Sequence, residues 1–332
     1  MNPLAYNQDL SLGRLARQAM LWSLGFAVLL AATLQVVDLD AALVALHQLT
    51  LPLIVVVLGL SLVNYLLRCL RWHYLSRHLD VEVPVLTNSV YYVAGFAFTI
   101  TPGKIGEVVR LWFLKRRHGY GYAHTAGLLL LDRLTDAWPL LLLALLGAAP
   151  FAGQGPALVL ITLVLVTGSA IMLHPGWLRR MIKLVYQRLK RAPRLFAQML
   201  RAARLLGRFA SPALLTPPLL LGLGGWLAEI VGAWLVLDAL GASLSLTTVA
   251  FVFGFSMLVG SLPIFPGGIG GAEASMAGLL VWLGVPLPVA VAATAVIRLA
   301  TLGFAVVVGF LVLPLAAAIS RPRAVLVTAV NP

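Results

Sequence analysis

Long apolar runs, separated by short polar and basic segments, make up most of this chain of 332 residues. A helix needs about 20 apolar residues to cross a hydrocarbon core about 30 Å thick. Six runs are close to that length, and we expect each to be a full transmembrane helix. They are roughly residues 19–37, 52–70, 124–148, 157–173, 216–238 and 289–313.

Two further apolar runs, roughly 85–117 and 247–284, are interrupted near their middles by proline and glycine. Irregular backbone is tolerated at membrane depth only where protein or a water-filled cavity satisfies its N–H and C=O groups. Each run is therefore either a broken span or a re-entrant helical hairpin. The interrupting residues are Pro102, Gly103 and Gly106 in the first run and Pro266, Gly267, Gly268 and Gly270 in the second.

The composition excludes an ordinary soluble protein, because 61% of the residues are hydrophobic, 11% are charged and the mean hydropathy is +0.98. The net charge of +13 does not predict nucleic-acid binding, since Lys and Arg cluster in short loops beside apolar runs. The first run is longer than a signal-peptide core, and we expect a retained signal anchor. The fold class expected is an all-α integral membrane protein.

The basic residues decide between broken spans and hairpins. If both interrupted runs are hairpins, every Lys and Arg except Arg133 and Arg298 falls on one side of the membrane. That side is the cytoplasm by the positive-inside rule. If either run crossed once, the basic stretch 179–208 or the C-terminal pair would move outside. We therefore expect two hairpins, cytoplasmic N- and C-termini, and a multi-pass protein of a bacterial inner membrane.

The two interruptions share the pattern P-G-x-I-G, at Pro102 and again at Pro266, and each is followed at similar spacing by an arginine within a span. By the charge argument the first hairpin enters from the cytoplasm and the second from outside, so the units are inverted repeats, an architecture typical of transporters. The predicted division is an N-terminal helix and loop, a first repeat, a connecting helix with a basic stretch, and a second repeat. These are residues 1–50, 51–150, 157–212 and 213–320.

Charged residues within spans are costly and are candidate functional residues. Asp132 and Asp136 share one helical face, and Arg133 points to an adjacent face. Two readings remain open: internal ion pairs, Arg133 with Glu107 and Arg298 with Glu273 or Glu229, or guanidinium groups that bind a phosphate. Arg68 and Arg71 are expected to snorkel at the cytoplasmic end of their span, with capture of a lipid headgroup as the alternative. The candidate substrate-binding residues are Arg133, Arg298, Asp132, Asp136, Glu107, Arg110 and Glu273.

The segment Trp177–Phe209 has ten basic and no acidic residues, with apolar positions at helical spacing. It predicts an amphipathic cytoplasmic stretch, bent near Pro193, that is either a solvated topogenic loop or a surface that docks on anionic lipid headgroups. The single cysteine, Cys69, excludes a disulfide framework, and no histidine pair has metal-ligand spacing. We expect no metal, no cofactor and no enzymatic activity.

Five motifs together resemble the lysylphosphatidylglycerol synthase transmembrane (flippase-like) family. They are Arg68-Cys-Leu-Arg-Trp72, the segment from Pro102 to Arg110, Asp132-Arg133 with Asp136, Pro266-Gly-Gly-Ile-Gly270 with Glu273, and Ile297-Arg298. The resemblance implies a membrane domain that, in those synthases, moves the aminoacylated lipid between leaflets. Stand-alone relatives are associated with polyprenyl-linked and hopanoid pathways. This chain ends shortly after its last expected span, so we expect no synthase domain.

The resulting hypothesis is a lipid transporter that moves a lipid with a polar or phosphate-bearing headgroup through a cavity between the repeats. The lipid is a phospholipid, a polyprenyl-linked lipid or a hopanoid, and a lipid-biosynthetic enzyme is a possible partner. Two alternatives are an ion-coupled transporter of a small polar solute and a non-transporting scaffold for lipid or cell-envelope biosynthesis. The sequence leaves the oligomeric state, the direction of transport and the coupling ion open.

Overall fold

The computed structural model describes residues 12–36, 46–101, 105–148, 175–189, 211–262 and 268–321, together with residues 44, 163, 193, 196, 197 and 200. Every regular element in these residues is helical. The first half contains α1 (Leu12–Val36), α3 (Leu51–His78), α4 (Val85–Ala94), η1 (Gly95–Phe98), α5 (Ile105–His118) and α6 (Tyr122–Ala148). The remainder contains α8 (Pro175–Leu189), α10 (Pro212–Ala239), α11 (Leu246–Gly260), α12 (Gly271–Trp282), α13 (Leu287–Arg298), the π-helix η5 (Leu299–Gly303) and α14 (Phe304–Ile319).

Four helical segments among the described residues are long and apolar enough to cross a membrane. They are Leu12–Ala32, Leu51–His78, Ala213–Ala239 and the continuous segment Leu287–Ile319. Helix α6 has 27 residues, and its central charges interrupt an otherwise apolar sequence. These helices confirm a multi-pass, all-α membrane protein. The expected span at 157–173 lies outside the described residues, apart from Leu163.

Both interrupted apolar runs fold back as helical hairpins. Their arms have 15 residues or fewer, which is too short to cross the hydrocarbon core. In the first hairpin, α4 and η1 pack against α5, and a Cβ atom on Gly106 would meet the carbonyl oxygen of Gly95. In the second, α11 packs against α12, and a Cβ atom on Gly260 would meet Ala272. The turn residues Pro102, Gly103, Pro266 and Gly267 lie outside the described residues.

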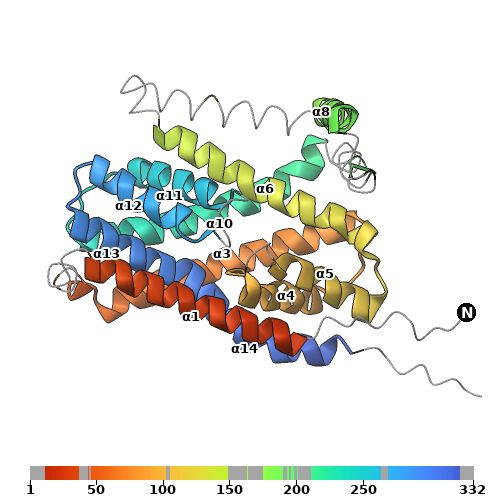
Figure 1. Ribbon diagram of the computed structural model, residues 1–332, viewed down its shortest axis with the longest axis horizontal. Coiled ribbons are helices and arrows are strands. Elements are labelled where there is room, and N and C mark those ends of the chain that lie inside the picture. Colours follow the sequence, from red (N-terminus) through yellow and green to blue (C-terminus); the bar gives the residue numbers. More distant parts are fainter. Residues whose placement is uncertain are drawn as a thin grey trace, which may run out of the picture.

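In each half, the long helix that follows the hairpin packs against the hairpin of the other half. Helix α6 packs on α11 of the second hairpin, while α14 packs on α4 and η1 of the first. Glycine permits both close approaches: a Cβ atom on Gly147 in α6 would meet the backbone of α11, and one on Gly309 in α14 would meet η1. Helix α3 packs along α10 between them. In Figure 1, α6 and the α13–α14 segment run in opposite directions along the bundle, as inverted copies require.

The first hairpin enters the bundle from the end where α1 begins and α14 ends, and the second enters from the opposite end (Figure 1). Buried side chains form one large cluster around the first hairpin and another around the second. Many large apolar residues on the outer faces of the helices remain exposed, including Leu51, Leu66 and Leu311. Such an apolar exterior is what lipid contact requires, because the solvent there is hydrocarbon.

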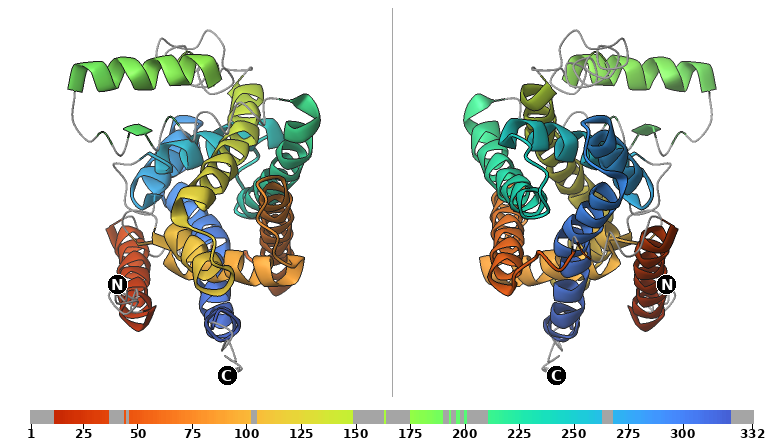
Figure 2. Two further views of the ribbon diagram at one scale, coloured as in Figure 1. Left: turned by 90° about the vertical axis from the view of Figure 1, so that its right-hand side faces the viewer. Right: turned by 90° about the vertical axis from the view of Figure 1, so that its left-hand side faces the viewer.

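Helix α8 lies across the long axis of the bundle and beside it, as the two views of Figure 2 show. Its apolar residues Trp177, Met181 and Leu184 are exposed, and the helix carries four basic and no acidic residues. Ile182 on another face is buried against Phe196 and Leu200. The expected amphipathic helix is therefore present, while the predicted bend near Pro193 falls mostly outside the described residues.

Candidate functional site

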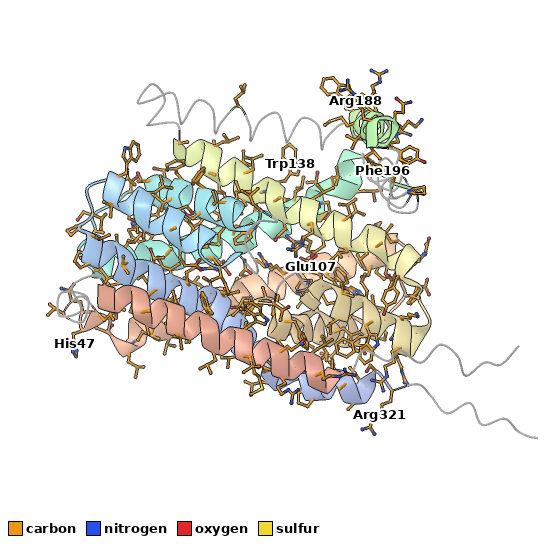
Figure 3. The ribbon with its side chains drawn as sticks, in the orientation of Figure 1. His47, Glu107, Trp138, Arg188, Phe196 and Arg321 are labelled. Carbon is orange, nitrogen blue, oxygen red and sulfur yellow. The ribbon has the colours of Figure 1, made fainter. Side chains whose placement is uncertain are left out.

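A cavity of about 390 Å³ opens where the inner ends of the two hairpins meet. Its wall includes Gly106 and Glu107 from the first hairpin and Gly260 and Gly268 from the second. Glu107 lies in the interior of the bundle, well away from His47 at one end and Arg321 at the other (Figure 3). The cavity is thus at mid-depth, which is the usual location of transporter sites between inverted repeats.

Five of the seven predicted binding residues line this cavity. They are Glu107, Arg110, Arg133, Asp136 and Arg298. The other two lie one layer behind: Asp132 holds Arg133 on one wall, and Glu273 holds Arg298 on the other. The cavity therefore brings together residues that are more than half of the sequence apart, such as Glu107 and Arg298.

The first wall is built around α6. Asp132 and Asp136 share one face of α6, as their spacing predicted, and the structure turns that face toward α3, where both meet Arg71. The Arg71 guanidinium lies 3.0 Å from Asp132 Oδ1 through Nη2 and 2.9 Å from Asp136 Oδ1 through Nη1. Arg68, one helical turn earlier, lies 3.3 Å from Asp136 Oδ1 and stacks over the Trp226 ring.

The expected snorkelling of Arg68 and Arg71 is wrong. The Arg71 side chain is completely shielded from solvent, and that of Arg68 is 16% exposed. Sequence analysis placed both at the end of a span of ordinary length, but α3 continues to His78. The two arginines consequently lie inside the bundle, where the carboxylates of α6 compensate their charge.

Arg133 bridges α6 and the first hairpin. Its Nη1 lies 3.3 Å from Glu107 Oε1, and its Nη2 donates to Asp132 Oδ2 at 3.1 Å. One third of its side chain remains exposed, more than for Arg68, Arg71, Arg110 or Arg298. The predicted Arg133–Glu107 pair therefore exists in a form that still presents donors to the cavity.

Arg110 reaches the same wall from α5. Its guanidinium lies 3.7 Å from the centre of the Tyr92 ring, and its Nε donates to the Tyr92 carbonyl at 3.1 Å. Its Nη1 is 3.9 Å from Asp132 Oδ2, and it has no hydrogen-bond partner among the described residues. Arg110 thus brings a cationic group with an unused donor to the cavity wall.

The opposite wall is built from the second hairpin. Glu273 Oε1 accepts from Arg298 Nε at 2.5 Å, and Oε2 accepts from the backbone N–H of Gly270 at 2.7 Å. One carboxylate therefore caps α12 and orients Arg298. Gly270 has φ +85°, in the left-handed region that glycine adopts without strain. Of the two predicted partners of Arg298, the structure selects Glu273.

A π-helix begins directly after Arg298. Such segments are rare and are frequently found at functional sites. Tyr65 from α3 donates its hydroxyl to the carbonyl oxygen of Thr301 within this π-helix, at 2.6 Å. Both residues line the cavity. The irregular turn thereby gives α3 a polar attachment to the second repeat.

Sequence analysis did not include several cavity residues among the candidates. They are Tyr65, Arg68, Trp226 and Glu229, and behind them Arg71. The spacing could have identified Arg68 and Arg71. They are three residues apart and so lie on one face of α3, just as Asp132 and Asp136, four residues apart, lie on one face of α6. Glu229 was noted only as a partner for Arg298, and it forms no ion pair among the described residues.

The charges around the cavity form what we call the arginine–carboxylate cluster. It contains five guanidinium groups and five carboxyl groups among the described residues. They are Arg68, Arg71, Arg110, Arg133 and Arg298, with Glu107, Asp132, Asp136, Glu229 and Glu273. With all ten ionised the cluster is neutral, which is how buried charge is tolerated in a low-dielectric interior.

Curated proteins that this chain resembles are described as membrane proteins. A UPF0104 membrane protein of Methanothermobacter thermautotrophicus is 25% identical over 256 residues, which cover 69% of this chain and 75% of that protein. A further match to a UPF0104 membrane protein of this organism is 45% identical over 67 residues, or 20% of each chain.

The sequence pattern of the family described as Lysylphosphatidylglycerol synthase TM region matches residues 20–309. That range includes both hairpins and every member of the arginine–carboxylate cluster. The chain therefore belongs to the lysylphosphatidylglycerol synthase TM region family.

Proposed function

We propose that this protein moves a lipid with a phosphate-bearing headgroup between leaflets of a bacterial inner membrane. The observation that carries the proposal is the cavity at mid-depth, with Arg133 and Arg298 on opposite walls contributed by the two repeats. Guanidinium groups bind phosphate through planar pairs of N–H donors. A headgroup in the cavity would meet such donors from both halves of the protein.

The size and lining of the cavity suit a headgroup. Ligand pockets for small molecules typically measure about 300–1,000 Å³, and this cavity falls near the lower limit. Its wall combines guanidiniums with apolar side chains such as Leu130, Leu140 and Leu302. In the proposed mechanism the headgroup enters the cavity while its acyl chains remain in the bilayer, and rocking of the repeats exposes it to each side in turn.

In the proposed function the protein moves the lipid without changing it chemically. The cavity carboxylates Glu107 and Asp136 are held by guanidiniums, while Arg110 Nη1 and Arg133 Nε keep donors that an anion can use. Such pairing also disfavours the alternative in which these carboxylates hold a transported cation. We assign the protein no enzymatic role, and a lipid-biosynthetic enzyme is proposed only as the supplier of its substrate.

The orientation follows from charge. The end of the bundle where α1 begins and α14 ends carries Arg77, Arg117 and Arg321, and α8 with its four basic residues lies toward the same end (Figures 1 and 3). The positive-inside rule makes this the cytoplasmic end. The first hairpin then enters from the cytoplasm and the second from outside.

A proteoliposome assay tests the proposed function. Purified protein is reconstituted with a fluorescent phosphatidylglycerol, and movement between leaflets is followed by adding a membrane-impermeant quencher. We expect transfer by the wild type, loss of transfer in Arg133→Gln and Arg298→Gln, and normal transfer in Arg77→Gln, whose side chain is exposed on α3. Because Arg133→Gln leaves Glu107 unpaired, the double variant Arg133→Gln/Glu107→Gln should also be inactive while avoiding that destabilisation. Wild-type rates in both arginine variants would refute the role.

A further inference from the structure

Glu229 differs from the other acidic members of the arginine–carboxylate cluster. Each of Glu107, Asp132, Asp136 and Glu273 has a guanidinium within 4.0 Å, whereas Glu229 has neither an ion pair nor a hydrogen bond among the described residues. It lines the cavity, and the residue is only 7% exposed. A carboxyl group so placed is costly as an ion.

The position of Glu229 matches that of Arg68 in the other half. Helices α3 and α10 both have 28 residues, and Arg68 and Glu229 occupy the same place along them. Arg68 forms no ion pair with Glu229, because Asp136 and the Trp226 ring hold its guanidinium. Arg298 is held by Glu273 in the same way. The two arginines whose charge acts on Glu229 are therefore each paired with another carboxylate.

The surroundings of Glu229 favour a proton over a larger cation. The charged and titratable groups that act on it are Tyr65 and Arg68 from α3, Asp136 from α6 and Arg298 from α13. From α11 the cavity wall receives Met257 and Leu258, which carry no charge. An ammonium group placed beside Glu229 would have Arg68 and Arg298 as neighbours and would be repelled. A proton binds to the carboxyl group itself and neutralises it, so no separate cation has to fit between Glu229 and the two arginines.

Protonation of Glu229 changes the charge of the whole cluster. With Glu229 ionised, the five guanidiniums and five carboxylates balance, and a bound anion would leave a net buried negative charge. With Glu229 protonated, the cluster carries one positive charge, which a single phosphate diester would neutralise. Net buried charge is unfavourable in a low-dielectric interior, so the proton and the anion stabilise each other's binding.

We propose that Glu229 is a proton-binding site that couples proton uptake to binding of a singly anionic phosphate headgroup in the cavity. This inference rests on the proposed function and deepens it by naming the charge of the substrate and the coupling ion. On binding, one proton from the aqueous phase joins a carboxylate oxygen of Glu229. On release, the proton and the lipid leave together, so movement of the lipid is linked to the transmembrane proton gradient.

Calorimetry counts the coupled proton directly. The purified full chain is titrated with dihexanoyl phosphatidylglycerol, whose phosphate diester does not titrate near neutral pH, in two buffers of different ionisation enthalpy. We expect uptake approaching one proton per lipid in the wild type and none in Glu229→Gln, which should still bind. Because binding takes up a proton, raising the pH should weaken wild-type affinity by up to about tenfold per pH unit and leave the variant unchanged. Asp238→Asn, an exposed position on the same helix, is the control and should behave as the wild type.

The possible results separate this inference from the proposed function. Binding by the wild type without proton uptake, or with uptake equal to that of Glu229→Gln, overturns the role of Glu229 and leaves lipid transport standing. No binding by a monodisperse wild type overturns both. If Glu229→Gln does not fold, Glu229→Asp keeps a titratable group and should retain proton uptake, and wild-type binding without proton uptake still overturns the role of Glu229.

Discussion

Arg71 of α3 and Asp132 of α6 form an ion pair that is completely shielded from solvent, with Arg71 Nη2 3.0 Å from Asp132 Oδ1. The pair joins two helices of the first repeat behind the cavity wall, and Arg71 Nη1 also reaches Asp136. Because the same carboxylates bind Arg68 and Arg133, this buried pair determines how the more exposed arginines are presented.

Truncation of Arg71 should therefore destabilise the protein strongly. Arg71→Ala leaves Asp132 without its closest partner, and breaking a buried pair from one side typically costs about 3–5 kcal/mol. The measurement is thermal or denaturant unfolding in detergent. Arg77→Ala on the exposed end of α3 should change stability little. Equal stability of the two variants would contradict the structural role of Arg71.

Close glycine contact in the first hairpin gives a second prediction. Gly106→Ala places a Cβ atom against the carbonyl oxygen of Gly95, so the arms of the hairpin must separate. We expect a loss of stability of about 1–3 kcal/mol or more and reduced lipid transfer. The matched control is Gly278→Ala in α12, where nothing lies within 4 Å. That change should stabilise its helix by roughly 0.5–1 kcal/mol. A neutral Gly106→Ala would argue against the packed hairpin.

The two contacts of Glu273 can be separated by substitution. Glu273→Gln keeps an oxygen that can accept from the Gly270 N–H but removes the charge opposite Arg298. Glu273→Ala removes both contacts. We expect both variants to lose lipid transfer, and only Glu273→Ala to lose the additional cap, typically worth about 1 kcal/mol of stability. Identical unfolding of the two variants would show that the cap contributes nothing.

Orientation in the membrane can be checked with introduced cysteines. The native Cys69 is buried, so the wild type should not react with an impermeant maleimide. In intact spheroplasts His47→Cys, at the expected external end, should react. Gly121→Cys, in the exposed loop between α5 and α6, should react only after the membrane is permeabilised. The reverse pattern would place the termini outside and contradict the charge-based topology.

Several features of the fold could be predicted from the sequence for identifiable reasons. Uninterrupted apolar length predicted α3, α10 and the α13–α14 segment, since the membrane imposes a minimum span. The Pro-Gly interruptions together with the basic residues predicted both hairpins. If either interrupted run crossed the membrane only once, later basic residues would lie outside, against the positive-inside rule. The spacing of Asp132 and Asp136 predicted a shared helical face. The predicted end of α3 was wrong, because the apolar run ends near residue 70 whereas the helix continues to His78. This error put Arg68 and Arg71 outside the bundle.

What the sequence by itself determined is the solvent, the helical class, the two hairpins and the set of charges that must be compensated. These follow from local properties: apolar length, backbone breaks and the placement of Lys and Arg. Only the tertiary structure decided between the pairings that the sequence left open: Arg71 pairs with Asp132 and Asp136, the suggested pairs Arg133–Glu107 and Arg298–Glu273 form, and Glu229 has no ion pair among the described residues. Pairing depends on how α3, α6 and α10 pack across the two repeats, and that packing brings together residues far apart in the chain.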